Sequence, residues 1–120
     1  MGEYKSWKKL VRDLIPSQLE AKGITVIYSV ISDFLGQDHF SRMKLAEEAA
    51  EVAKAKSRGE IIEEMADVAD AFDLVLKVNK ITPQELSDAR AKKNAEKGGL
   101  DKFYYLDSTE EPDNPDGQQQ

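Results

Sequence analysis

Two helix-forming segments separated by a short break constrain this fold more than any other feature of the sequence. Residues 44–51 are Lys-Leu-Ala-Glu-Glu-Ala-Ala-Glu and residues 63–67 are Glu-Glu-Met-Ala-Asp, and these residue types have high helix propensity. The break between them is Ser-Arg-Gly at 57–59. We therefore expect two antiparallel helices joined by a turn, the first over about 38–56 and the second over about 60–79.

Each of the two helices carries a pair of carboxylates at a spacing of three residues, which places both on one face. In an antiparallel pair turning at 57–59, Glu51 falls opposite Glu64, and Glu48 falls opposite Asp67. Four carboxylates that converge in this way repel one another unless a cation neutralises them. Carboxylate oxygens suit Mg²⁺ or Mn²⁺ better than zinc or copper. The pattern therefore predicts a metal site, whereas the alternative is two solvated helix faces, because acidic residues at this spacing are common.

The rest of the chain predicts a mainly α-helical protein. Pro16 is placed to begin a short helix that ends before Gly23, and Thr82-Pro83 is placed to begin a last helix that runs to about residue 97. The segment 24–31 is rich in β-branched residues, which favour a strand. Its only candidate partner is 103–106, so we expect an all-α bundle with a small two-stranded ribbon at its edge.

Apolar residues cover more than one face of the predicted helix 60–79. A helix of this kind is buried nearly all round, which a chain of 120 residues with so few helices does not achieve alone. We therefore expect a homodimer or homotetramer. Residues 1–106 should form one domain, and 107–120, an acidic segment with two prolines and few apolar residues, should be a disordered tail.

Composition excludes several classes of function. The chain has no cysteine and a single histidine, which excludes thiolate nucleophiles, Cys-based zinc sites and sites that need two imidazoles. Five acidic residues of the tail account for most of the net charge of −6. The remainder is nearly neutral, so a charged nucleic-acid-binding surface is not expected. No apolar run is long enough to span a membrane, and we expect a cytoplasmic protein.

Basic residues near both ends are candidate partners for a phosphorylated ligand. Lys93 and Lys97 lie near the end of the last predicted helix, followed by Gly98-Gly99. For these lysines on their own a solvated helix end is the preferred explanation. Beside a magnesium site it is weaker, because lysine and arginine bind the phosphates that share such an ion with carboxylates. Residues 9–13 have the composition of a docking segment, from which Arg12 could reach the site.

Together these motifs resemble the all-α nucleoside triphosphate pyrophosphohydrolases, which include MazG, dimeric dUTPases and phosphoribosyl-ATP pyrophosphohydrolase. The acidic pattern is similar to the signature of that superfamily. The segment 9–16, Lys-Leu-Val-Arg-Asp-Leu-Ile-Pro, resembles the start of a MazG-like branch, with Leu14 where lysine is usual. The segment 93–100 resembles a closing element of that branch, with Lys97 for arginine and Leu100 for phenylalanine.

The resemblance implies a role for each matched residue. Glu48, Glu51, Glu64 and Asp67 would hold Mg²⁺, and Lys93 and Lys97 would bind phosphates. Glu47 would orient the attacking water, a task that Glu51 could share as an orienting carboxylate or proton acceptor. Arg12 joins the predicted substrate-binding residues, and Asp70 has a possible ligand or supporting role.

The implied reaction is hydrolysis of a nucleoside triphosphate to a monophosphate and pyrophosphate, as in removal of non-standard or excess nucleotides. Within the family, the alternative is hydrolysis of phosphoribosyl-ATP. The alternative from another class is a non-catalytic helical oligomerisation module whose acidic residues serve solubility.

Overall fold

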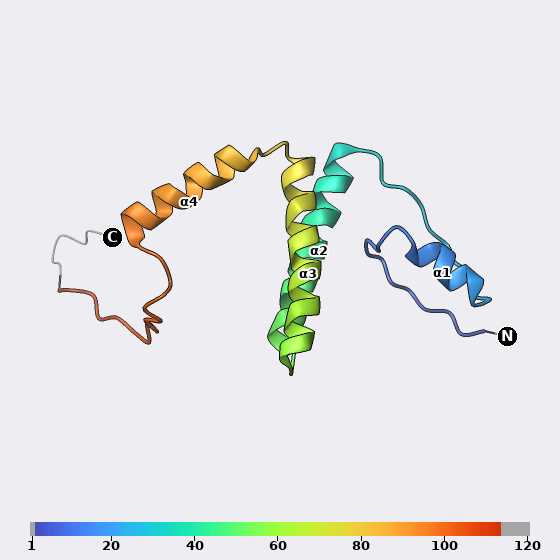
Figure 1. Ribbon diagram of the computed structural model, residues 1–120, viewed down its shortest axis with the longest axis horizontal. Helices are drawn as coiled ribbons and strands as arrows, with labels where there is room; N and C mark the ends of the chain where they lie inside the picture. Colours follow the sequence, from blue (N-terminus) through green and yellow to red (C-terminus); the bar gives the residue numbers. More distant parts are fainter. Residues whose placement is uncertain (1, 114–120) are drawn as a thin grey trace. The chain divides into compact units, whose positions relative to one another are not determined.

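A computed structural model describes residues 2–113 of the chain and contains four α-helices (Figure 1). They are α1 (Ile15–Ala21), α2 (Phe34–Lys54), α3 (Arg58–Val78) and α4 (Pro83–Lys97). No residue between 2 and 113 belongs to a β-strand, which confirms the predicted all-α class.

The chain divides into two compact units, Met1–Pro83 and Gln84–Gln120. The segment 24–31 lies in the first unit and 103–106 in the second, and neither is helix or strand. The ribbon predicted between them and the single domain over 1–106 both stay predictions. Residues 107–113 of the predicted tail have no regular secondary structure, and its remainder, 114–120, lies outside the described residues.

Helices α2 and α3 form the packed pair of the first unit (Figure 1). Only residues 55–57 connect them, and so short a connection makes the two helices antiparallel neighbours. Ser57 begins α3 as its N-cap: its hydroxyl accepts from the Glu60 amide at 3.1 Å, and the Glu60 carboxylate accepts from the Lys56 amide at 3.0 Å. This arrangement resembles a capping box, except that Glu60 accepts from the amide that precedes the N-cap. Helix α3 thus starts two residues before the predicted position.

Helix α2 also begins earlier than predicted, because Asp33 acts as its N-cap. The Asp33 carboxylate accepts from the Gly36 amide at 2.9 Å. Gly36 fits here for a steric reason, since a Cβ atom at this position would lie 2.7 Å from Ile31 Cγ2 and 2.8 Å from Asp33 Oδ1. Gly36 therefore belongs to the first turn of α2.

The helix pair buries very little apolar surface within one chain. Ala71 is the only buried hydrophobic residue of the described part, with 5% of its surface exposed, and the other buried residues there are Ser41 and Glu48. Large apolar side chains of α3 remain substantially exposed, namely Ile61, Ile62, Met65, Phe72 and Leu74. The expected burial of α3 on nearly all sides is therefore not achieved by the chain on its own.

Helix α4 ends at Lys97 as predicted, and α1 ends at Ala21, one residue before the predicted end at Lys22. Gly23 and Gly98 adopt φ values of +81° and +84°, a region that is strained for other residues. Their amides donate to carbonyl oxygens of the preceding turns, Glu20 and Asn94 respectively, at 2.9 Å each. None of the described helices is long and apolar enough to cross a membrane.

Candidate metal centre

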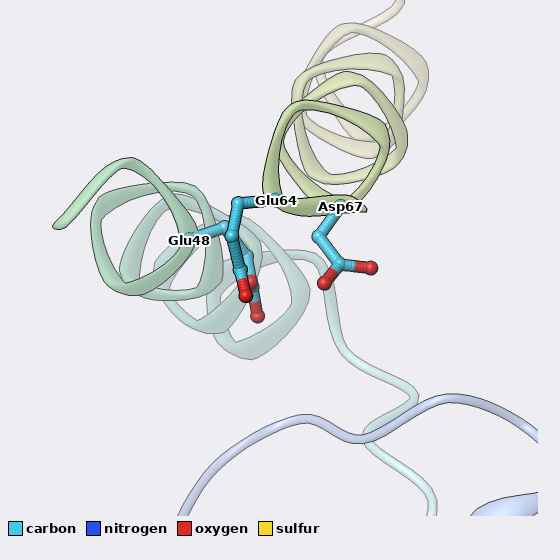
Figure 2. Close-up of side chains that lie close together, drawn as sticks. All are labelled: Glu48, Glu64 and Asp67. Atoms are coloured by element: carbon cyan, nitrogen blue, oxygen red, sulfur yellow. The ribbon is translucent and has the colours of Figure 1, made fainter. Parts of the chain in front are cut away.

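Three carboxylates converge between α2 and α3. Glu48 comes from α2, and Glu64 and Asp67 come from successive turns of α3. One ligand oxygen from each residue lies within 4.8 Å of the corresponding oxygens of the other two. Figure 2 shows the three carboxyl groups turned toward the same side of the helix pair. Glu48, Glu64 and Asp67 therefore lie together as the sequence pattern predicts, and the three can hold a metal ion.

Glu48 is the most buried of the three and is paired with a lysine of its own helix. Only 8% of its surface is exposed, and its Oε1 lies 3.1 Å from Lys44 Nζ, one turn earlier. Burial acts to lower the pKa of Lys44, but hydrogen bonds to Glu48 and Glu47 outweigh it and raise that pKa. Lys44 therefore stays charged and provides a positive charge beside the buried Glu48 side chain.

Glu64, unlike Glu48, forms no ion pair with any basic side chain within residues 2–113. Partial burial raises the pKa of Glu64, and repulsion from Asp67, Glu51 and Glu48 raises it further. Its negative charge is thus the least compensated in the cluster. A cation at this point would remove the repulsion that the carboxylates otherwise exert on one another.

Asp67 is paired with Arg12 of the N-terminal segment. Arg12 Nη2 lies 2.6 Å from Asp67 Oδ1 and 2.8 Å from Asp70 Oδ2. The hydrogen bonds to Asp67 and Asp70 raise the pKa of Arg12 above its already high value. Arg12, predicted as a substrate-binding residue, therefore reaches the site but contacts two carboxylates of α3 there. Asp70 lies beside the triad as a partner of Arg12.

The predicted catalytic residue Glu47 is held by two lysines at the edge of the triad. Its carboxylate lies 3.0 Å from Lys9 Nζ and 3.2 Å from Lys44 Nζ. Burial acts to raise the pKa of Glu47, but the hydrogen bonds from Lys9 and Lys44 dominate and lower it. A carboxylate held in this way is fixed in position and weakly basic, which suits orientation of a water better than acceptance of its proton.

Glu51, predicted both as a ligand and as a catalytic residue, is not one of the three converging carboxylates. Its Oε1 instead lies 3.8 Å from Lys54 Nζ. It is close enough to act electrostatically on Glu64. Its predicted ligand role stays a prediction, and would require its side chain to turn from Lys54 toward the triad.

The charges around the triad do not balance. Five carboxylates and three cations belong to the triad or to the ion pairs that touch it, namely Glu47, Glu48, Glu64, Asp67 and Asp70 with Lys9, Arg12 and Lys44. The neighbouring pair of Glu51 and Lys54 adds no net charge. With all groups ionised, two negative charges remain. This residual charge is equal and opposite to that of one divalent cation.

The sequence pattern only partly predicts the ion pairs that basic residues of the N-terminal segment form with the acidic cluster. Lys44 precedes Glu47 and Glu48 by three and four residues, a spacing that predicts its ion pairs. Lys9 and Arg12 lie 38 and 55 residues from their partners, so no local spacing predicts those contacts. Lys93 and Lys97 lie on α4 in the second unit, and their predicted phosphate-binding role stays a prediction.

Comparisons with known proteins add no relative: no family model matches the chain, and neither curated proteins nor solved structures gave a significant match. The resemblance to the MazG-like enzymes therefore depends on the sequence motifs.

Proposed function

We propose that this chain is a divalent-cation-dependent nucleoside triphosphate pyrophosphohydrolase, which adds water to the substrate and releases a nucleoside monophosphate and pyrophosphate. The observation that supports the proposal most directly is the convergence of Glu48, Glu64 and Asp67 within 4.8 Å. The motifs that flank these residues in the sequence supply the reaction, because they are similar to those of the MazG-like enzymes. Clearance of unwanted nucleotides in the cytoplasm is the cellular role we infer.

The donor set supports Mg²⁺ as the ion, with Mn²⁺ as its substitute. All three converging side chains offer carboxylate oxygens, and the two uncompensated charges of the cluster match one such ion. In enzymes of this chemistry a divalent ion offsets the charge of the phosphates and activates water. The chain's own part is to hold the ion with Glu48, Glu64 and Asp67 and to keep Glu47 in a fixed position between Lys9 and Lys44.

The proposal is tested with a panel of nucleoside and deoxynucleoside triphosphates and phosphoribosyl-ATP, each incubated with the full chain and Mg²⁺ while pyrophosphate is measured. We expect release with at least one nucleoside triphosphate and loss of that release when EDTA removes the metal. A preference for phosphoribosyl-ATP would instead favour the alternative within the family. Absence of pyrophosphate with every compound would refute the enzymatic proposal.

Two adjacent residues provide a matched pair of variants for this assay. Glu64→Gln removes a carboxylate of the triad, whereas Glu63→Gln makes the same change at an exposed neighbour outside it. We expect Glu64→Gln to lose nearly all turnover and Glu63→Gln to retain it. Equal turnover in the two variants would show that the triad is not the site of the reaction.

We also propose that the active form is a homo-oligomer, with a homodimer as its smallest form. The support is the small core, in which Ala71 is the only buried hydrophobic residue among residues 2–113, and the apolar side chains that α3 leaves exposed. The same exposed surface would suit a non-catalytic oligomerisation module. The pyrophosphate assay separates the two functions, because such a module forms the oligomer without hydrolysing any nucleotide.

A further inference from the structure

Arg12 binds carboxylates of the acidic cluster that a divalent cation would also bind, so the two cations would compete. Its Nη2 atom contacts both carboxylates, at 2.6 Å from Asp67 Oδ1 and 2.8 Å from Asp70 Oδ2. Asp67 is also one of the three residues whose oxygens converge. A guanidinium nitrogen bound to that carboxylate therefore performs part of the neutralisation that a metal ion would perform.

The N-terminal segment that carries Arg12 is attached to the cluster by a second ion pair. Lys9 Nζ lies 3.0 Å from Glu47 Oε1 on α2, while Arg12 binds α3. Both contacts involve substantially exposed basic side chains, and exposed ion pairs are weak. The segment can therefore leave the carboxylates at little cost when a stronger cation arrives.

We propose that Arg12 is an internal counter-cation of the metal site, which holds Asp67 and Asp70 while the site is free of metal and is displaced when a divalent cation binds Asp67. This inference depends on the proposed metal site. It makes Arg12 a positioning residue that sets the affinity for the ion through Asp67. Once displaced, its guanidinium is available to an anionic ligand that shares the ion, such as a phosphate group.

The experiment measures Mn²⁺ binding to the full chain without nucleotide, by calorimetry or by the electron paramagnetic resonance of free Mn²⁺. Because removal of Arg12 removes both competition and a repelling charge, Arg12→Gln should bind Mn²⁺ about three- to tenfold more tightly than the wild type. Arg42→Gln makes the same change at an arginine that pairs with Asp38 outside the cluster, and it should leave the dissociation constant within about twofold of the wild-type value.

The Arg12→Lys variant tests whether the positive charge of Arg12 or the shape of its guanidinium group determines the affinity for Mn²⁺. A single nitrogen of Arg12 makes both contacts, so the one amino group of a lysine can replace it. We expect this variant to bind Mn²⁺ like the wild type, whereas equal tightening in Arg12→Lys and Arg12→Gln would overturn the proposal. Circular dichroism spectra of all variants confirm that the helices are retained.

The outcomes separate this inference from the proposed function. If the wild type binds Mn²⁺ and Arg12→Gln binds it equally or more weakly, Arg12 does not compete and only the counter-cation proposal fails. If neither protein binds Mn²⁺, or if Glu64→Gln binds it as well as the wild type, the triad is not a metal site and both proposals fail.

Discussion

Shortening the apolar side chains on one stripe of α3 should weaken self-association of the chain. Ile61 and Met65 are four residues apart and therefore share a face of the helix. They retain 45% and 50% of their surface exposed. The double variant Ile61→Ala/Met65→Ala removes most of this apolar area, while alanine, the best helix former, keeps α3 helical.

The exposed fractions give the expected magnitude. Full burial of a side chain of this size contributes about 1.5–3 kcal/mol. Because about half of each side chain is already buried within the chain, burial of the rest in an interface contributes about 1 kcal/mol per residue. Two residues on each of two protomers give about 4 kcal/mol, which corresponds to a roughly thousandfold weaker dimer.

Sedimentation equilibrium over a series of protein concentrations measures this effect. If dissociation also unfolds the chain, the thermal midpoint of the variant will lie below that of the wild type at each protein concentration. Glu63→Ala is the control, because it introduces alanine on the same helix without removing apolar area. A wild-type monomer at high concentration would refute the interface, and a double variant that weakens the dimer by less than about tenfold would show that this stripe lies outside it.

Two further predictions concern stability. The folded-state pKa of Glu64 is raised, so the contribution of Glu64 to stability is most favourable below its ordinary pKa of 4.5 and is lost as the pH rises through the raised pKa. Glu64→Gln should therefore stabilise the metal-free chain at pH 7 but not at about pH 4. Equal effects of this variant on urea denaturation at both pH values would contradict this reasoning. Gly36→Ala should destabilise the chain by about 1–3 kcal/mol through the close contacts with Ile31 and Asp33. Gly59→Ala should instead stabilise the chain by about 0.5–1 kcal/mol, because its Cβ would come no closer than 3.9 Å to Ser57 Oγ. Thermal denaturation that ranks the two variants in the opposite order would refute the steric argument.

The helices were predictable because their signals are local in the sequence. Glycine ends α1 and α4, proline begins α4, and the two central helices have strong helix formers on both sides of a short break. Helices α2 and α3 begin earlier than the sequence pattern predicts, because Asp33 and Ser57 act as their N-caps. Asp33 and Ser57 were the available signals, since each is a favoured N-cap residue three positions before a backbone amide that needs an acceptor.

The candidate site was predictable only in its helical part. Spacing alone indicates that Glu64 and Asp67 share a face and that Glu48 lies across the turn from them. Spacing does not give the side-chain orientation that turns Glu51 toward Lys54. Nor does it give the contact from Arg12 to Asp67, because an ion pair across 55 residues depends on the path of an irregular segment.

The arrangement of the cations indicates how a cluster of carboxylates can remain ready for a metal ion. Lys44 extends from α2 itself and is largely screened from solvent, so it offsets Glu48 whether or not an ion is bound. Lys9 and Arg12 belong to a segment without regular structure and are exposed, so their compensation is removable. Glu64 alone among the three converging carboxylates has no cation partner within residues 2–113. Of the three converging carboxylates, Glu48 thus has a permanent counter-charge, Asp67 has a removable one and Glu64 has none. In the proposed metal site, a divalent cation would therefore gain most from its interaction with Glu64.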